Sequence, residues 1–275
     1  MRIGAFFFSL CLVMSAGARG QQSWTDPVSG LGFVKVPPGC FDMGADRPGT
    51  PGPGWIHAVP GPDEVPRHKV CVDGFWLSKS EVTRGAYARV TGAVEHVVEV
   101  PKANVTWDEA VRFAALLSEK AGARFRLPTE AEWEWACHAG DPKPAVQAEG
   151  SDRFRLFEET AKVAWYRYEM QRDPAGAYNV MQKQPNAYGL FDMLGNTWEW
   201  VADGYDEAAY SRHAENNPKQ PVVDDRRVIR GGSYKTDVAR VRCGARNYAP
   251  AEERTDLIGF RVLRELEPPI AGDKK

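Results

Sequence analysis

The residues of this chain best suited to redox or metal chemistry are its five cysteines and five histidines. Cys11 lies within an apolar N-terminal run, and the other four, Cys40, Cys71, Cys137 and Cys243, include no C-x-x-C pair. The histidines, at positions 57, 68, 96, 138 and 213, contain no i, i+4 pair, so they indicate neither a zinc signature nor an iron facial triad. In an oxidising compartment four cysteines favour two disulfides, for which three pairings are possible.

Other catalytic signatures are missing from the sequence. It has no G-x-S-x-G, P-loop or dinucleotide-binding fingerprint, and no base can be identified beside Ser233. The catalytic residues, if there are any, therefore stay unknown at this level. A formal net charge of -2 gives no bulk electrostatic reason to bind nucleic acid or an anionic membrane.

The N-terminus is predicted to be a secretory signal peptide over residues 1–22. Arg2 supplies the positive charge, residues 3–14 the apolar segment, and residues 16–18 (Ala-Gly-Ala) a small-residue cleavage site. No second apolar stretch is long enough to span a bilayer. We therefore expect a periplasmic or secreted protein with one domain over residues 23–264 and a disordered tail over 265–275.

Two helices carry the clearest local signals among the elements that must position any site. The first begins at Thr106, which forms a capping-box pattern with Glu109, and ends at Gly122. The second begins at Thr129, where Glu132 repeats the same pattern. Both helices carry apolar residues on one face, which indicates packing against a core.

The rest of the chain is expected to be mostly strands and turns. Residues 29–44 are predicted to form a strand with a turn at Pro37-Pro38-Gly39, and residues 68–82 to form another strand pair. Thr83 is expected to cap a short helix, and the Gly- and Pro-rich residues 45–66 to form a surface loop. The stretch from about 140 to 230 has few periodic segments, so we expect disulfide bonds or metal ions to stabilise it.

Eight segments, read in order, carry a resemblance to a known family. They are Phe41-x-Met43-Gly44, Glu64-x-Pro66-x-His68-x-Val70, Glu81-Val82-Thr83, the run RLPTEAEWE from Arg126 to Glu134, PNAYGL from Pro185 to Leu190, GNTWEW from Gly195 to Trp200, Arg230-Gly231-Gly232-Ser233, and Gly259-Phe260-Arg261. Together the segments make the chain resemble the formylglycine-generating enzyme, or sulfatase-modifying factor, family from about residue 32 to 264. The resemblance implies an α+β fold related to the C-type lectins, with little regular secondary structure and bound calcium.

The resemblance also implies a disulfide pairing. Cys137 and Cys243 match positions that are disulfide-bonded in some family members, which leaves Cys40 to pair with Cys71. A Cys137–Cys243 bridge would close a loop of more than 100 residues. The chain-entropy description assigns about 4–5 kcal/mol of stability to a loop of that length.

One calcium site of the family is carried over to the G-N-x-W-E-W segment, where the matching positions are Leu194, Gly195, Thr197 and Glu199. Backbone carbonyls and a carboxylate are suitable calcium ligands. The alternative makes Glu199 an ordinary buried ion-pair partner. A second family site begins at an Ala-Asn sequence, where this chain has Lys162, and an ammonium group cannot ligate a metal. One hypothesis is that Lys162 replaces that second ion.

The oxidase members of the family bind copper through two cysteines between the G-G-S-[YF] turn and the R-C-x-A-R strand. Here the segment reads GGSYKTDVARVRCGAR, with no cysteine before Cys243, and it is shorter by two or three residues. Neither a hydroxyl nor a carboxylate replaces thiolate as a soft ligand for Cu(I). Leu257 also stands where the family has an asparagine. Copper-dependent formylglycine formation is therefore the least favoured activity.

The favoured function is that of a non-catalytic, exported accessory domain that binds a peptide or protein. Its binding surface would be the family groove, which corresponds to Ser233, Tyr234, Lys235, Asp237, Arg240, Arg246, Asn247 and Tyr248. The partner itself is not identified by the sequence.

Two alternatives remain. The first is a cysteine-independent enzyme that tailors an exported peptide, similar to family members tied to siderophore maturation, with Asp237, Arg240 or Glu252 in acid–base roles. The second is a ligand-binding protein diversified at its lectin-like face. That alternative ranks last, because the region is not rich in asparagine and a tail follows it.

Overall fold

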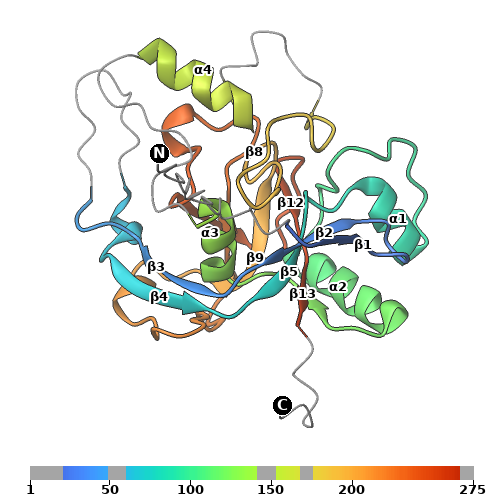
Figure 1. Ribbon diagram of the computed structural model, residues 1–275, viewed down its shortest axis with the longest axis horizontal. Coiled ribbons are helices and arrows are strands. Elements are labelled where there is room, and N and C mark those ends of the chain that lie inside the picture. Colours follow the sequence, from blue (N-terminus) through green and yellow to red (C-terminus); the bar gives the residue numbers. More distant parts are fainter. Residues whose placement is uncertain (1–20, 49–59, 141–152, 168–175, 267–275) are drawn as a thin grey trace, which may run out of the picture.

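The computed structural model describes residues 21–48, 60–140, 153–167 and 176–266. Within these ranges the chain forms two larger sheets and two short two-stranded ribbons, with helices packed around them (Figure 1). Most of the predicted signal peptide and most of the predicted tail lie outside the described residues. Glu265, where the tail was expected to begin, is the last residue of a strand.

The first sheet joins the two ends of the described chain. Its five strands lie in the order β1 (Ser23–Thr25), β2 (Gly32–Val36), β5 (Phe75–Ser78), β13 (Leu263–Glu265) and β6 (Phe125–Arg126). All neighbouring strands are antiparallel. The late strand β13 is inserted between β5 and β6, so the sheet is completed only by residues near 263.

The second sheet carries the segments with most of the sequence motifs. Its strands lie in the order β11 (Arg246–Pro250), β10 (Arg226–Arg230), β9 (Trp198–Gly204) and β12 (Ile258–Phe260). Only the β9–β12 pair is parallel. Every residue of β9 is buried, which is typical of a strand that is covered on both faces.

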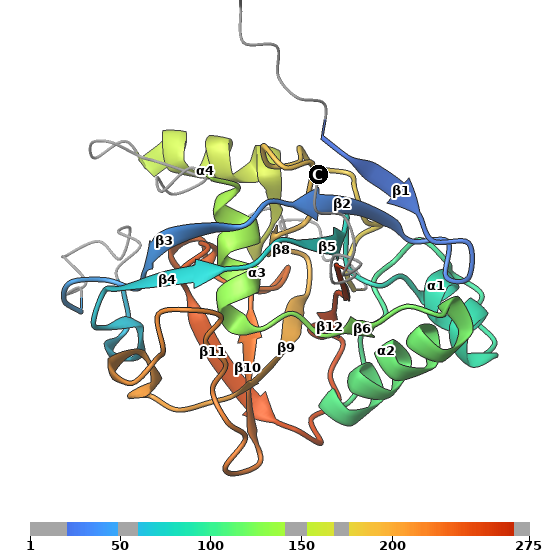
Figure 2. The same cartoon turned by 60° about the horizontal axis from the view of Figure 1, so that its bottom comes forward.

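Two ribbons complete the strands: β3 (Gly39–Met43) with β4 (His68–Val72), and β7 (Ala164–Trp165) with β8 (Leu194–Gly195). The prediction that residues 68–82 pair with each other was wrong. Residues 32–43 instead run antiparallel to residues 68–78 along their length, β2 against β5 and β3 against β4 (Figure 2). Each strand therefore obtains its partner from the other segment, and β4 and β5 belong to different sheets.

The helices follow the capping signals. They are α1 (Arg84–Thr91), α2 (Trp107–Ala121), α3 (Glu130–His138) and α4 (Arg153–Val163). Thr83, Thr106 and Thr129 each accept a backbone N–H at the start of α1, α2 and α3, and Gly122 ends α2 with φ 65°. Helix α3 contacts β3 and β4 on one side and β9 and β10 on the other. It therefore joins the ribbon to the second sheet.

The connections of the described residues include the 3₁₀ turns η1 (Pro62–Glu64), η3 (Ala209–Ser211) and η4 (Val238–Arg240). Residues 45–66 were predicted to be a surface loop, and this is wrong for Glu64, which is 4% exposed. Its carboxylate forms two hydrogen bonds with the Arg242 guanidinium, and this partner explains why a charged residue is buried here.

Both predicted disulfides are confirmed, Cys40–Cys71 and Cys137–Cys243. Cys40 lies opposite Cys71 in the β3–β4 register, whereas Cys137 of α3 is joined to the loop before β11. The α+β fold with limited regular structure is confirmed as well. No helix in the described part of the chain has the length and apolar character needed to cross a membrane.

We expect the two disulfides to differ in their contribution to stability. The bridges span sequence separations of 31 and 106 residues. By the chain-entropy relation, removal should cost about 4 kcal/mol for Cys40–Cys71 and about 5 kcal/mol for Cys137–Cys243. Urea unfolding of the two paired Cys→Ala variants measures both values. A larger loss for the Cys40–Cys71 variant would contradict this order.

Candidate functional site

The Gly-Gly-Ser turn places the predicted groove segment against the core. Gly231 and Gly232 have φ of 93° and 85°, and a Cβ atom on Gly231 would lie 3.1 Å from the Met193 carbonyl oxygen. Ser233 then donates its backbone N–H to the Thr236 hydroxyl at 2.8 Å, and the two hydroxyls lie 3.2 Å apart. The Thr236 side chain therefore closes the turn in the segment that contains no cysteine.

The predicted groove residues fall into a buried and an exposed group. Ser233 and Tyr234 are each 1% exposed, whereas Lys235, Asp237 and Arg240 are exposed. Asp237 caps η4 by accepting the Ala239 N–H, and Arg240 donates to the Arg246 carbonyl at 3.3 Å. The exposed charges thus lie on a short loop that is tied to the start of β11.

Arg246 lies inside the domain rather than on the predicted groove surface. Its guanidinium is 1% exposed and donates to both Glu130 oxygens, at 2.7 and 2.9 Å. A third nitrogen donates to the Asp63 carbonyl at 2.6 Å. A charged side chain this deep needs such partners, so Arg246 is committed to holding α3 against β11.

Arg230 extends this buried network. It donates to Glu130 at 3.1 Å, to Glu134, and to the Cys243 carbonyl at 2.7 Å. Burial opposes ionisation of Glu134, but the charges and hydrogen bonds of Arg230 and His138 together outweigh it and lower the pKa of this carboxyl to about 2. The two arginines and two glutamates of this network therefore have a net charge of zero. Sequence reasoning did not find this network, since the partners lie about 100 residues apart.

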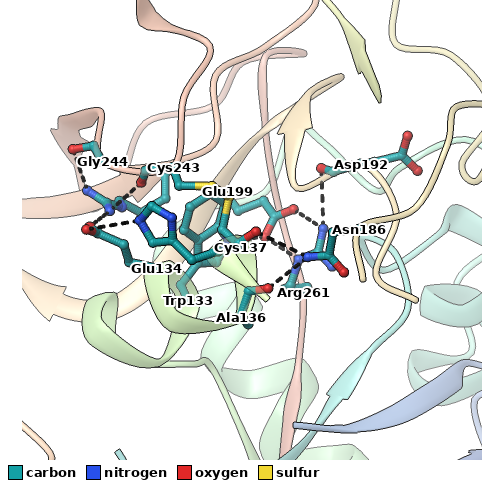
Figure 3. Close-up of a disulfide and its surroundings, with 12 residues drawn as sticks. Trp133, Glu134, Ala136, Cys137, Asn186, Asp192, Glu199, Cys243, Gly244 and Arg261 are labelled. Atoms are coloured by element: carbon teal, nitrogen blue, oxygen red, sulfur yellow. Dashed lines mark hydrogen bonds and ion pairs between the residues drawn. A yellow bond between two sulfur atoms is a disulfide. The ribbon is translucent and has the colours of Figure 1, made fainter. Parts of the chain in front are cut away.

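Glu199, the predicted calcium ligand, is paired with Arg261. The Arg261 guanidinium donates to both Glu199 oxygens, each at 2.6 Å, and the Trp133 indole N–H donates at 2.7 Å (Figure 3). All three side chains are buried. The ion pair that was considered as an alternative for Glu199 is therefore present.

Two further carboxyl groups lie beside this pair, and sequence reasoning missed them. Glu81 and Asp192 are buried, and each has one oxygen, Oε2 and Oδ1 respectively, with no hydrogen-bond partner among the described residues. Burial and the charges of Asp192 and Glu199 raise the pKa of Glu81 well above its usual range. Burial likewise raises the pKa of Asp192 to about 6. Arg261 alone does not balance these three acids.

The donor chemistry of this cluster suits a hard cation. Leu194, Gly195 and Thr197 are buried in the segment that ends at Glu199, and the Thr197 hydroxyl donates to Glu81 at 3.3 Å. Calcium is coordinated by both carbonyl and carboxylate oxygens. The described part of the chain holds no group of three or more His, Cys, Asp or Glu side chains placed for a metal. An ion here would therefore depend on backbone carbonyls.

The hypothesis that Lys162 replaces a second ion is wrong. The Lys162 side chain is 50% exposed and pairs with Glu159, one turn earlier in α4, at 2.7 Å. An ammonium group at the helix surface is solvated and cannot stand in for a bound cation.

Comparison with known proteins shows which family the chain matches and which proteins it is similar to. Residues 21–266 match the family described as "Sulfatase-modifying factor enzyme 1-like domain". The chain is similar to the formylglycine-generating enzyme of Mus musculus, 24% identical over 92% of this chain and 80% of the relative. It is similar to hercynine oxygenase of Mycolicibacterium smegmatis, 31% identical over 82% of this chain and 49% of the relative. The solved structure of PvdO from Pseudomonas aeruginosa is 28% identical, with a TM-score of 0.75, over 90% of this chain and all of that chain.

We expect Glu81→Gln to change the pH dependence of stability. A buried acid with a raised pKa binds protons more tightly in the folded state, so the free energy of unfolding falls as pH rises above the usual glutamate pKa of 4.5. Glutamine keeps an oxygen that accepts the hydrogen bond from Thr197, and it does not titrate, so the fall in the free energy of unfolding with pH is removed. In EDTA, the variant should therefore gain stability relative to the wild type between pH 5 and pH 8.

Urea unfolding at both pH values measures the effect. Glu119→Gln, which changes an exposed glutamate of α2, is the control and should follow the wild type. A difference between Glu81→Gln and the wild type that is the same at both pH values would show that Glu81 does not titrate in this way.

Proposed function

The chain belongs to the sulfatase-modifying factor enzyme 1-like family, and from this premise we propose that it is an exported domain that binds a peptide or protein and lacks copper-dependent oxidase chemistry. The export rests on the signal-peptide pattern of residues 1–22. The binding role rests on the segment between the Gly-Gly-Ser turn and Cys243, which carries charged groups in place of thiols.

One observation supports the proposal that the chain lacks oxidase chemistry: the segment has no side chain suited to bind copper. Thr236 uses its hydroxyl to close the turn, and Cys243 is bonded to Cys137. A disulfide sulfur offers no thiolate, and a hydroxyl is a poor ligand for Cu(I). The segment 233–243 therefore has no soft ligand for copper.

The same segment supports binding of an extended partner. Lys235, Asp237 and Arg240 are exposed and lie on a loop attached to β11, which is an edge strand of its sheet. Tyr248 of β11 is 45% exposed, and the Arg226 guanidinium lies 5.6 Å from the centre of its ring. Aromatic and arginine side chains are favoured in interfaces, and an edge strand can accept a peptide as an added strand.

We expect charge reversal on this loop to weaken binding. Peptides selected from a random displayed library on the immobilised protein serve as probes, and fluorescence anisotropy measures their Kd. The Lys235→Glu, Arg240→Glu double variant should raise Kd by about tenfold or more, because two rim charges are reversed. Arg112→Glu, Lys120→Glu, a reversal on exposed positions of α2, should leave Kd unchanged. Equal losses in both variants, or a selection that yields no binder, would count against the proposed surface.

The proposal includes one calcium ion near Leu194, Gly195, Thr197 and Glu199. The unpaired oxygens of Glu81 and Asp192 support it, because they are buried acceptors beside this segment and have no donor among the described residues. A calcium ion would offset that charge and hold the β8–β9 connection in place.

We expect calcium to stabilise the wild type, so its melting temperature should be higher in calcium than in EDTA. A concentration of about 1 mM CaCl₂ is suitable, because calcium sites of extracellular modules have Kd values of up to about 1 mM. Glu199→Gln should lose this response and also destabilise the protein by about 3–5 kcal/mol in EDTA, because Arg261 is left buried without its partner. Asp224→Asn, which breaks an exposed pair with Arg226, is the control and should keep the calcium response. A wild type indifferent to calcium would overturn the calcium site while leaving the ion pair in place.

A second candidate function is a cysteine-independent tailoring enzyme that acts on an exported peptide. The similarity to PvdO over the whole length of that chain favours it, as does a relative whose name denotes an oxygenase. Asp237 would have to leave its capping role to act in proton transfer, because it accepts the Ala239 N–H. Mass spectrometry of a selected peptide after aerobic incubation separates the two functions: an altered mass favours the enzyme, and an unchanged mass favours the binding domain.

A further inference from the structure

Two histidines that are 145 residues apart in sequence meet at the start of β4. His68 belongs to the Glu-x-Pro-x-His segment, to which the proposed function gives no role, and His213 follows η3. Their facing nitrogens, His68 Nε2 and His213 Nδ1, are 3.2 Å apart, and the ring centroids are 5.2 Å apart. Both side chains are partly exposed.

The other ring nitrogen of His68, Nδ1, is held by a hydrogen bond to the backbone. His68 Nδ1 lies 3.0 Å from the Pro66 carbonyl oxygen, which accepts only, so Nδ1 carries the proton. The neutral His68 ring then has its lone pair on Nε2, which accepts a hydrogen bond from His213 Nδ1 when no metal is bound. Imidazole ligands of metals are held in this way, with one nitrogen donating to a carbonyl and the other facing the ion.

The separation of the two nitrogens suits a shared ion. Zinc binds imidazole nitrogen at about 2.0–2.1 Å, so an ion bound to two nitrogens 3.2 Å apart would have an N–metal–N angle of about 100°. That value is close to the tetrahedral angle of about 109° favoured by zinc. Such an ion lies off the line that joins the two nitrogens, so both rings turn toward it and the two metal bonds replace the hydrogen bond between them.

We propose that His68 and His213 form a two-histidine site for a divalent transition metal, zinc or copper, whose remaining coordination positions are taken by water or by a ligand group. Imidazole is a suitable ligand for both ions. The site is separate from the carboxylate cluster at Glu199 and does not depend on the proposed peptide surface.

The backbone around the pair is held rigidly. Cys71 of β4 donates its N–H to the Glu215 carbonyl at 2.7 Å, and the Asn217 N–H donates to the Cys71 carbonyl at 2.7 Å. The Cys40–Cys71 disulfide anchors the same strand. The segment that carries His213 is thereby fixed beside β4, and a site on fixed elements loses little entropy when it binds an ion.

The charges that face the pair allow a cation. Glu130, Glu134 and Arg246 all act electrostatically on His213. The positive charge of Arg246 is offset by its two bonds to Glu130.

The contact with His68 leaves the second nitrogen of His213 unused. His213 Nε2 and the Tyr210 hydroxyl are buried and have no hydrogen-bond partner within the described residues, and the two rings pack with centroids 5.3 Å apart. When Nδ1 binds a metal, the ring proton moves to Nε2.

Isothermal titration of the EDTA-stripped full chain with ZnCl₂ at pH 7.5 tests the site. The wild type should bind one equivalent that His68→Gln and His213→Gln each weaken by about tenfold or more, and that the double variant loses. His96→Gln, which changes an exposed histidine, is the control and should bind as the wild type does. The far-UV circular dichroism and melting temperature of each variant without metal verify that it is folded.

Electron paramagnetic resonance with Cu²⁺ gives an independent measure of the ligands. The wild type should show coupling to two nitrogens, which the single variants reduce. Absence of zinc uptake by the wild type would overturn the proposal, as would a folded double variant that binds with unchanged affinity.

Discussion

The buried network of two arginines and two glutamates is the interaction on which the rest of the structure depends. Glu130 and Glu134 extend from α3, and Arg230 and Arg246 extend from β10 and β11, so the network joins the helix to the second sheet. Cys137 and Cys243 join the same regions covalently. With one partner removed, a charge would stay buried without compensation, which is far more costly than losing a surface pair. The Gly-Gly-Ser turn follows β10 directly, so the network also sets where the loop between this turn and Cys243 begins.

The carboxylate cluster around Glu199 differs from this network in its charge balance. Four charges cancel around Glu130, whereas Arg261 faces Glu199, Glu81 and Asp192 together. A protein relieves such an excess by keeping some of the acids protonated or by placing a cation beside them. The raised pKa values of Glu81 and Asp192 correspond to the first solution, and the proposed calcium ion to the second. Both solutions keep the start of β9 in one position.

The sequence predicted local structure well and long-range pairing poorly. The caps at Thr106 and Thr129 were predictable because the interacting atoms lie within four residues. The disulfides were predictable only through the family resemblance, since four cysteines allow three pairings. Arg246 was placed on a surface because its position corresponds to the family groove. Its pairing with Glu130, 116 residues earlier, leaves no periodic signal in the sequence.

The position of β13 has a consequence for how the chain is made. Leu263 pairs with Leu77, and Arg261, just before it, closes the pair with Glu199, so the first sheet is complete only when residues near 263 have been synthesised. A ribosome extends the chain by about 5–20 residues per second, and strands without partners stay exposed until then. The domain therefore cannot complete its fold from the N-terminus onward.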